Sequence, residues 1–386
     1  MKKYSLIVAS SFGLESLVAR ELRDLGYDNL VIENGRVAFR GDERDIARCN
    51  IRLRTADRIF IKVAEFRALD FEELFQGTRE VPWDGMIPID GKIHVVGKSV
   101  RSKLASVRDC QSIVKKAIIE TMKRKFRLSE FPETGPTYKV EVSVVKDLAT
   151  LAVDTTGPGL HKRGYRTEAG EAPLRENLAA ALVMLSRWTP PRVFADPLCG
   201  SGTIAIEAAL IGKNIAPGLR RSFVAERWRQ IPKPIWDVVR EEARAQESKA
   251  AFRVLASDQD SGVLKVARQN ALSAGVGDCV VFQKLPVGEF KSQKKYGCLI
   301  SNPPYGLRMG DSRDVEMLYQ KMGAVFSMLD AWSFFILTAY PRFEQFFGRR
   351  ADRNRKLYNG DVKCYLYEFF GSFPPQAKEK LGQRFV

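Results

Sequence analysis

The segment RVFADPLCGSGTIAIEAALIG, residues 192–212, carries the strongest fold signal in the chain. Its first seven residues are a short apolar run typical of a buried strand, and residues 203–212 are apolar over a length that suits a helix. Between them, Gly200 and Gly202 allow a tight turn and a close approach of the backbone to a ligand. The segment therefore predicts a strand, a glycine loop and a helix that begins at the loop.

The same alternation continues on both sides of this segment. Strand patterns occupy residues 252–258, 296–304, 332–340 and 363–370, helical patterns occupy residues 261–275 and 315–329, and another helix is predicted from about Leu174. Strands that alternate with helices in this way predict a doubly wound α/β sheet from about residue 165. In such sheets ligands bind outside the carboxyl ends of the strands, so polar residues at those ends are candidate site residues.

The first candidate cluster is the glycine loop itself. Asp196 ends the predicted strand, where its carboxylate can accept hydrogen bonds from a ligand ammonium. A dinucleotide site would have a third glycine and an acidic residue about 20 residues further on. Ile206 stands in place of that glycine, and the next acid at a strand end, Asp258, is much further along the chain. The sequence therefore disfavours a nicotinamide dinucleotide.

The second cluster is Asp258-Gln259-Asp260, which follows the predicted strand at residues 252–258. A carboxylate at that strand end can accept hydrogen bonds from both hydroxyls of a ribose. Either aspartate can instead serve as the N-cap of the next helix, and the two roles can coexist across the two acids.

The third cluster is Asn302-Pro303-Pro304-Tyr305, which follows the apolar strand at residues 296–301. Two prolines end a strand because they donate no hydrogen bond, and they expose rigid carbonyls. An amino group conjugated to a base ring is a poor nucleophile. Its lone pair becomes available when the Asn302 side-chain oxygen and the Pro303 carbonyl accept its two N–H bonds, and the Tyr305 ring offers a stacking face. This tetrapeptide predicts a site that holds an exocyclic amine of a base and turns its lone pair toward an electrophile, although the same four residues taken alone could form a turn.

The N-terminal part of the chain has a different pattern of predicted strands and helices. Residues 3–9 predict a strand, residues 14–27 a helix, residues 31–41 a hairpin with its turn at Asn34-Gly35, and residues 42–66 a helix and a strand. Residues 71–83 and 106–126 predict helices, and residues 92–100 and 138–156 predict strands. Lys115 and Lys116 lie mostly off the apolar stripe of the helix at residues 106–126, so they are candidates either for RNA phosphates or for a solvated helix face.

Together these motifs resemble class I S-adenosylmethionine-dependent methyltransferases that act on exocyclic amino groups. HKRGYR (residues 161–166), APLRENLAAAL (172–182), NIAPG (214–218) and RKLYNGDVKCYLYEF (355–369) narrow the resemblance to the THUMP-domain branch, which includes bacterial 23S rRNA guanine-N2 methyltransferases of the RlmL/YpsC type. The resemblance implies a ferredoxin-like α+β module at residues 1–65, a THUMP RNA-binding domain at residues 66–160 and a Rossmann-like methyltransferase domain at residues 161–386.

The resemblance also assigns roles to residues. It implies that S-adenosylmethionine is the cofactor and that RNA, most specifically 23S rRNA or an assembly intermediate of the ribosome, is the partner. Asn302, Pro303, Pro304 and Tyr305 would be the catalytic residues. The cofactor would be held by Asp196, Cys199, Gly200, Ser201, Gly202, Thr203, Asp258 and Gln259. RNA would be contacted by Lys115, Lys116, Arg163, Arg166 and Arg308.

The sequence departs from the family pattern at two places. Many relatives have an acidic residue after the next strand, where it holds the adenine of the cofactor, but residues 280–290 read VVFQKLPVGEF, in which only Gln283 or Glu289 can substitute. Residues 213–250 form an insertion before Asp258, which leaves the outer strand order open. Longer relatives add a second methyltransferase domain, so we expect one activity from a chain that ends at Val386.

Composition is consistent with this interpretation. Lys and Arg total 62 against 46 Asp and Glu, a net charge of +16, and the excess is present in both halves of the chain, which favours polyanionic partners. Six scattered cysteines and two histidines form no metal-binding pattern, and no membrane helix or signal peptide is expected, so we expect a reduced, cytoplasmic, metal-free protein.

The sequence leaves several alternative functions open. The methylated group could be a guanine of transfer RNA, adenine N6 of a nucleic acid or a glutamine of a protein. The chain could also be an RNA-binding ribosome-assembly factor without activity.

Overall fold

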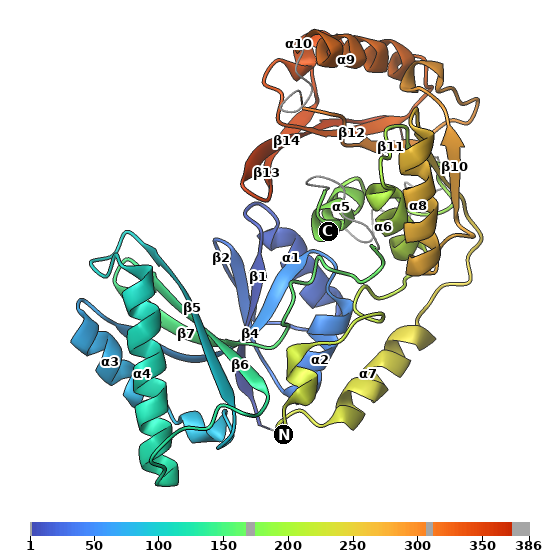
Figure 1. Ribbon diagram of the computed structural model, residues 1–386. Coiled ribbons are helices and arrows are strands. Elements are labelled where there is room, and N and C mark those ends of the chain that lie inside the picture. Colours follow the sequence, from blue (N-terminus) through green and yellow to red (C-terminus); the bar gives the residue numbers. More distant parts are fainter. Residues whose placement is uncertain (1, 167–173, 306–311, 373–386) are drawn as a thin grey trace. The chain divides into compact units, whose positions relative to one another are not determined.

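The computed structural model describes residues 2–166, 174–305 and 312–372. The chain forms two compact units (Figure 1). The N-terminal unit comprises residues 1–10, 18–160 and 221–242, and the C-terminal unit comprises residues 11–17, 161–220 and 243–386. The segment at residues 221–242, which lies within the insertion seen in the sequence, is therefore part of the N-terminal unit.

The N-terminal unit is built on one seven-stranded sheet in the order β2-β3-β1-β4-β7-β6-β5. The elements from the N-terminus to residue 154 are β1 (Tyr4–Ser10), α1 (Glu15–Asp24), β2 (Val31–Glu33), β3 (Arg36–Gly41), α2 (Glu43–Arg52), β4 (Ala56–Arg67), α3 (Phe71–Arg79), the 3₁₀ turn η1 (Trp83–Gly85), β5 (Lys92–Val100), α4 (Val107–Phe126), β6 (Thr137–Val145) and β7 (Leu148–Asp154). The long strand β4 pairs with β1 on one side and with β7 on the other. One sheet thus spans both predicted N-terminal modules, and their boundary at residue 65 stays a prediction.

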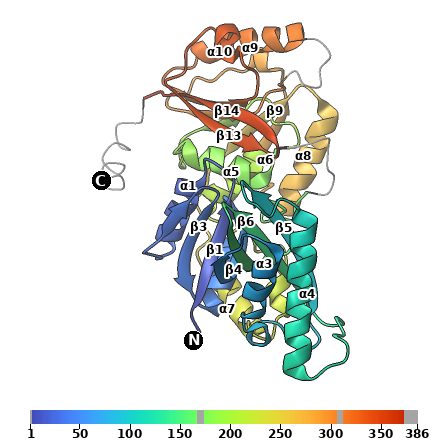
Figure 2. The ribbon, with the colours of Figure 1, turned by 90° about the vertical axis from the view of Figure 1, so that its left-hand side faces the viewer.

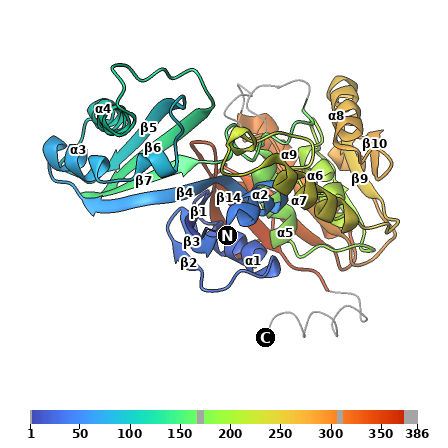
Figure 3. The same ribbon diagram turned by 90° about the horizontal axis from the view of Figure 1, so that it is seen from below.

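Local signals account for the helices of this unit. Asp42 accepts hydrogen bonds from the backbone N–H groups of Arg44 and Asp45 and forms a capping box with Asp45 at the start of α2. Ser106 caps α4 by accepting a hydrogen bond from the backbone N–H of Asp109. The helices α3 and α4 lie side by side over the strands at the β5 end of the sheet (Figure 3). The hairpin turn predicted at Asn34-Gly35 joins β2 to β3, and Gly35 has a φ of +77°.

The C-terminal unit is built on a second seven-stranded sheet in the order β10-β9-β8-β11-β12-β14-β13. Its elements, together with those of the insertion, are α5 (Glu176–Leu185), β8 (Phe194–Asp196), α6 (Thr203–Gly212), the 3₁₀ turn η2 (Val224–Arg227), α7 (Lys233–Ala245), β9 (Val254–Asp258), α8 (Ser261–Ala274), β10 (Val280–Lys284), the 3₁₀ turn η3 (Val287–Glu289), β11 (Cys298–Ser301), α9 (Ser312–Ser327), β12 (Ser333–Thr338), α10 (Phe343–Phe347), β13 (Arg353–Asn359) and β14 (Val362–Phe369). Figure 2 shows α9 and α10 next to each other in this unit.

This sheet has the doubly wound arrangement that the sequence predicts. Strands β10, β9, β8, β11 and β12 are parallel, and β14 is antiparallel to both of its neighbours, β12 and the edge strand β13. The strands β11 and β12 are buried along their whole length, as expected for central strands with helices on both faces. Because β8 and β11 are neighbours, the carboxyl ends of β8, β9 and β11 meet at the switch point of the sheet, where ligands bind.

Two other features bear on the expectations from composition. All six cysteines are buried and free, so the chain has no disulfide between described residues. No helix in the described parts of the chain combines the length and apolar character that crossing a membrane requires.

Candidate active site

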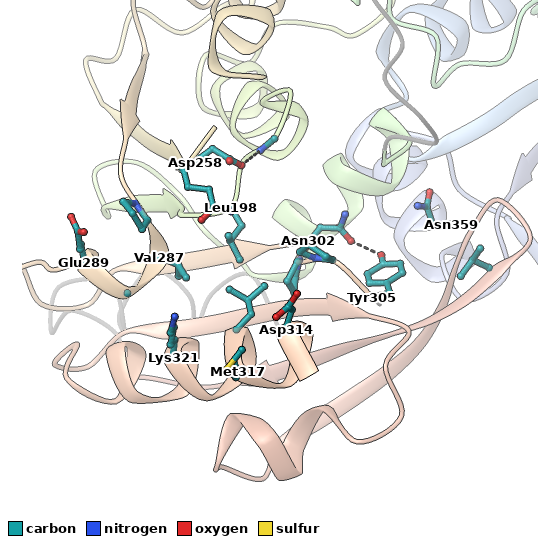
Figure 4. Close-up of a pocket in the computed structure, with 18 residues that line it drawn as sticks. Leu198, Asp258, Val287, Glu289, Asn302, Tyr305, Asp314, Met317, Lys321 and Asn359 are labelled. Atoms are coloured by element: carbon teal, nitrogen blue, oxygen red, sulfur yellow. Dashed lines mark hydrogen bonds between the residues drawn. The ribbon is translucent and has the colours of Figure 1, made fainter. Parts of the chain in front are cut away.

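A cavity of about 800 Å³ lies at the switch point of the C-terminal sheet (Figure 4). Its walls come from the loops that follow β8, β9, β10 and β11, from α9, and from the turn between β13 and β14. The lining residues are Leu198, Gly200, Asp258, Gln259, Pro286, Val287, Gly288, Glu289, Asn302, Pro303, Pro304, Tyr305, Asp314, Met317, Leu318, Lys321, Asn359 and Val362. The three predicted motifs therefore contribute to one cavity.

The glycine loop after β8 has positive φ values, which favour glycine. Gly200 and Gly202 have φ values of +51° and +84°, and a Cβ atom on Gly202 would lie 3.2 Å from the ring of Phe282. Of this loop, Leu198 and Gly200 line the cavity. Cys199 is buried, and its N–H bonds to the Ser257 carbonyl. Ser201, Gly202 and Thr203 also lie outside the cavity wall, so their predicted cofactor contacts stay proposals.

The two aspartates at the end of β9 and just after it have different roles: Asp258 faces the cavity and Asp260 caps the next helix. Asp258 accepts hydrogen bonds from the backbone N–H of Gly200 and from that of Asp260, each at 3.0 Å, and it faces the cavity. Asp260 accepts from the N–H of Gly262 and is the N-cap of α8. Asp258 thus connects the glycine loop to the second strand end, and each of its oxygens keeps a lone pair for a ligand hydroxyl.

Asp196 lies behind the cavity wall and is only 1% exposed. Its Oδ1 accepts from the Leu198 N–H at 3.4 Å and from the Ser301 hydroxyl at 3.3 Å. Its Oδ2 is buried and has no hydrogen-bond partner among the described residues. Burial, reinforced by the negative charge of Asp258, raises the pKa of Asp196 to about 8. Once deprotonated, Asp196 is a buried carboxylate with an acceptor that lacks a donor, and this fits a ligand that brings a positively charged N–H group.

The segment after β11 forms the opposite wall of the cavity. Asn302, Pro303, Pro304 and Tyr305 all line it. The Tyr305 hydroxyl donates to Asn302 Oδ1 and accepts a weak hydrogen bond from Cys364 Sγ at 3.7 Å. An amide oxygen has two lone pairs, so Asn302 Oδ1 retains one for a second donor while the tyrosine fixes its direction. Burial raises the pKa of Tyr305, which keeps the phenol in its donor form.

Several lining residues were not among the sequence predictions. Asp314, Met317, Leu318 and Lys321 come from α9, and Asn359 and Val362 flank the turn between β13 and β14. In the sequence, the motif YNGD, residues 358–361, points to the family resemblance and not to a site residue. Of the two residues considered for the adenine contact, Glu289 lines the cavity, whereas Gln283 does not.

The structure corrects one predicted RNA contact and weakens another. Arg163 is 3% exposed and its guanidinium is paired with Glu207 in the interior, so the prediction that it contacts RNA is wrong. Arg166 donates to the Leu174 carbonyl at 2.8 Å and to Thr203 Oγ1 at 2.6 Å, which anchors the start of α6. Its role toward RNA has no support from this geometry.

The other residues predicted to contact RNA, Lys115, Lys116 and Arg308, stay predictions. Lys115 pairs with Glu133 at 3.1 Å, and the largely exposed Lys116 lies 3.9 Å from Glu120. Arg308 lies outside the described residues.

Known families match the chain in three consecutive segments. Residues 5–60 match the RlmL ferredoxin-like domain, residues 68–154 match the THUMP domain, and residues 163–368 match the RMKL-like methyltransferase domain. The last match covers more than half of the 386 residues.

Individual proteins agree with the family matches. The chain is 49% identical over 385 residues to the YpsC protein of Bacillus subtilis, and the alignment covers 98% of this chain and 99% of that protein. It is 33% identical over 389 residues to the ribosomal RNA large subunit methyltransferase K/L of Syntrophotalea carbinolica, covering 95% of this chain and 54% of that longer protein. The crystal structure of SMU.472 complexed with SAH is similar with a TM-score of 0.91 and 45% identity, covering 97% of this chain and all of that one.

The cavity fits S-adenosylmethionine, and the similar structure of SMU.472 holds SAH, the form that remains after the methyl group has been transferred. Asp258 faces the cavity with free lone pairs, Gly200 leaves room for a ligand beside the loop, and Asp196 Oδ2 is an acceptor without a donor. S-adenosylmethionine is the cofactor of this protein, as the sequence predicts. The predicted fold class is likewise confirmed, and the chain belongs to the RMKL-like methyltransferase family, in which an RlmL ferredoxin-like domain and a THUMP domain precede the catalytic domain.

Proposed function

We propose that this protein transfers a methyl group from S-adenosylmethionine to the exocyclic N2 of a guanine in 23S ribosomal RNA. The observation that carries the proposal is the position of Asn302-Pro303-Pro304-Tyr305. The tetrapeptide ends the central strand β11 and shares one cavity with Asp258 and the glycine loop. A target amine held at the tetrapeptide would therefore face a cofactor held at the other wall.

The residues of the tetrapeptide suit an amine that has two N–H bonds. Asn302 Oδ1 keeps one lone pair beyond the one used by Tyr305, and no described donor reaches the carbonyl of Pro303. If these two oxygens accept the N–H bonds of the amine, its nitrogen lone pair is drawn out of conjugation with the base. The bound cofactor supplies a methyl group that is already activated on a sulfonium. The protein then contributes mainly orientation, so we assign no general base.

Charge and substrate access support RNA as the substrate. The net charge of +16 favours a polyanion, and a THUMP domain precedes the catalytic domain. A guanine inside a helix cannot reach the wall formed by Asn302, so we infer that the target base is unpaired or flipped into the cavity. The relative from Syntrophotalea carbinolica is named for large-subunit ribosomal RNA, which favours 23S RNA over transfer RNA.

A nucleoside measurement tests the proposal. Ribosomal RNA from a strain that lacks this gene would be incubated with the purified protein and S-adenosylmethionine with an isotopically labelled methyl group, then digested and analysed by mass spectrometry. We expect the label in N2-methylguanosine from 23S RNA and none when transfer RNA is the substrate. Label in N6-methyladenosine would replace guanine by adenine as the target. If no nucleoside of either RNA carries the label, the result would favour the alternative of an RNA-binding assembly factor.

A further inference from the structure

A line of hydrogen bonds that starts in α9 and β12 ends on the proposed catalytic tetrapeptide. The hydroxyl of Tyr319, in the middle of α9, lies 2.8 Å from the Pro304 carbonyl oxygen. The same hydroxyl lies 2.9 Å from Thr338 Oγ1, at the end of β12. Thr338 Oγ1 in turn lies 3.0 Å from the backbone nitrogen of Tyr340. The line therefore connects the tetrapeptide with α9 and with the end of β12.

The proton positions along this line follow from the groups themselves. The Pro304 carbonyl can only accept, so the single proton of the Tyr319 hydroxyl points to it. The Tyr319 oxygen must then accept the proton of Thr338, and the Thr338 oxygen accepts from the Tyr340 N–H. Every donor in the line has one acceptor, so the direction of each hydrogen bond is fixed.

The surroundings keep this line rigid. The side chains of Tyr319 and Thr338 have no exposed surface. The Tyr319 ring packs edge-on against Tyr340 and Phe343, with ring centroids 5.6 and 5.1 Å apart. Burial raises the pKa of Tyr319, so its hydroxyl remains a donor across the physiological pH range. The hydrogen bond between Tyr319 and Thr338 is fully buried, so solvent cannot replace it.

The two proline carbonyls differ in whether a protein group already donates to them. The Pro304 carbonyl is occupied by Tyr319, whereas the Pro303 carbonyl accepts no hydrogen bond from a described residue. Neither proline has an N–H group with which to anchor the tetrapeptide to a neighbouring strand. The bond from Tyr319 is therefore a fixed attachment between the tetrapeptide and the rest of the unit beyond the end of β11.

We propose that Tyr319 and Thr338 are positioning residues that hold Pro304 so that Asn302 Oδ1 and the Pro303 carbonyl stay aimed at the target amine. This rests on the proposed function of the tetrapeptide. Neither residue touches the substrate, and both act through the direction of the Pro304 carbonyl. Since methyl transfer depends on alignment, a small rotation of this segment slows the reaction while leaving the cofactor wall intact.

The test compares Tyr319→Phe, Thr338→Val and Thr338→Ser with the unchanged protein. Tyr319→Phe keeps the packed ring and removes the donor to Pro304. Thr338→Val keeps the shape and removes the hydroxyl, whereas Thr338→Ser keeps the hydroxyl. The matched control is Tyr367→Phe, because Tyr367 is also buried and packs against Phe343 at 4.8 Å but has no part in the line. The single-turnover rate of RNA methylation, the RNA concentration at half-saturation and the cofactor dissociation constant would be measured for each.

We expect Tyr319→Phe and Thr338→Val to slow single-turnover methylation about tenfold or more, in keeping with the sensitivity of aligned reactions to small displacements. The cofactor dissociation constant and the half-saturating RNA concentration should stay near those of the unchanged protein. Thr338→Ser should retain most of the rate, and Tyr367→Phe should retain all of it.

Two outcomes would overturn the proposal. One is an undiminished rate in Tyr319→Phe or Thr338→Val, and the other is an equal loss in Tyr367→Phe, which would indicate a general effect of packing. Asn302→Ala, assayed in parallel, separates this result from the proposed function. If Asn302→Ala is inactive and Tyr319→Phe is fully active, the positioning role alone is wrong. If Asn302→Ala is fully active, the tetrapeptide is not the catalytic segment.

Discussion

Asp196 illustrates the conflict between stability and binding at the scale of a single residue. It lies at the end of β8 with one oxygen hydrogen-bonded and the other without a partner among the described residues. Its pKa of about 8 lies above the ordinary value of 3.8 because burial disfavours the carboxylate. The folded state thus binds a proton that the unfolded state releases as the pH rises from about 4 to 8. Over this range the group makes folding progressively less favourable, and the loss is complete above pH 8.

We therefore expect Asp196→Asn to stabilise the ligand-free protein at pH 8 while weakening its affinity for S-adenosylmethionine. The amide retains Oδ1 as an acceptor for Leu198 and Ser301 but carries no charge. The affinity should fall about tenfold or more, because a hydrogen bond to a charged group typically contributes about 1.5–3 kcal/mol. Thermal melting at pH 5 and pH 8 measures the first effect, and calorimetric titration measures the second.

The pH dependence provides the internal control for this variant. The gain in melting temperature should be larger at pH 8 than at pH 5, since the unchanged protein keeps Asp196 protonated at the lower pH. An equal gain at both pH values would show that the titration of Asp196 is not its cause. Unchanged affinity would remove Asp196 from the cofactor site.

Single residues also show what the sequence can and cannot predict about the site. Asp258 and Asn302 could be located because each directly follows a strand pattern, and parallel strands bring their carboxyl ends to one edge. Asn359 and Lys321 could not, because they reach the cavity through the packing of a hairpin and a helix. Arg163 was misplaced because a charged residue in a Gly-rich segment resembles a surface residue, and its partner Glu207 lies 44 residues away in the sequence.

At the scale of elements, the predicted strands and helices agree with the structure where a single period dominates the sequence. The helix at residues 261–275 corresponds to α8, and the strand at residues 332–340 contains β12. The strand β13 was not predicted, because its sequence RNRKLYN is mostly polar and it is stabilised by pairing with β14 at the sheet edge. Edge strands of this composition lack the apolar alternation that marks a strand.

The segment at residues 221–242 is a second element whose place the sequence left open. It joins the N-terminal unit through Trp228, whose ring stacks on Tyr138 with centroids 4.6 Å apart and an interplanar angle of 12°. Trp228 Nε1 also donates to the Thr137 carbonyl at 3.2 Å, and Gln230 donates to the Met86 carbonyl at 2.6 Å. An insertion within the catalytic sequence is thus a structural part of the N-terminal unit.

We expect Trp228→Ala to destabilise the N-terminal unit by about 3–5 kcal/mol, the usual cost of removing a large buried aromatic side chain. Trp228→Phe keeps an aromatic ring for Tyr138 and loses the hydrogen bond to Thr137, so its cost should be smaller. Val238→Ala is the matched control in the same segment, because Val238 is 48% exposed. Urea unfolding followed by far-ultraviolet circular dichroism measures the differences. A Trp228→Ala protein as stable as the control would show that the segment does not hold this unit together.

At the scale of the whole molecule, the cavity and the segment that matches the THUMP domain lie in different units. The C-terminal unit contains every residue that lines the cavity, from Leu198 to Val362. The N-terminal unit contains the segment that matches the THUMP domain, together with Lys115 and Lys116. We infer that the N-terminal unit contributes RNA affinity and that the tetrapeptide after β11 contributes the chemistry. This division requires that loss of the tetrapeptide's polar contact affects methyl transfer and not the binding of the cofactor.

The single-turnover rate of methyl transfer by Asn302→Ala tests this most directly. Removing an oriented polar contact that acts in the transition state commonly slows a reaction about 100-fold or more, so we predict a loss of that size. Cofactor affinity should remain nearly unchanged, since Asp258 and the glycine loop are intact. Asn302→Asp keeps an acceptor for the amine and for the Tyr305 hydroxyl, so it should retain more activity than Asn302→Ala. A near-normal rate in Asn302→Ala would contradict the central claim and would reduce the tetrapeptide to a turn at the end of a strand.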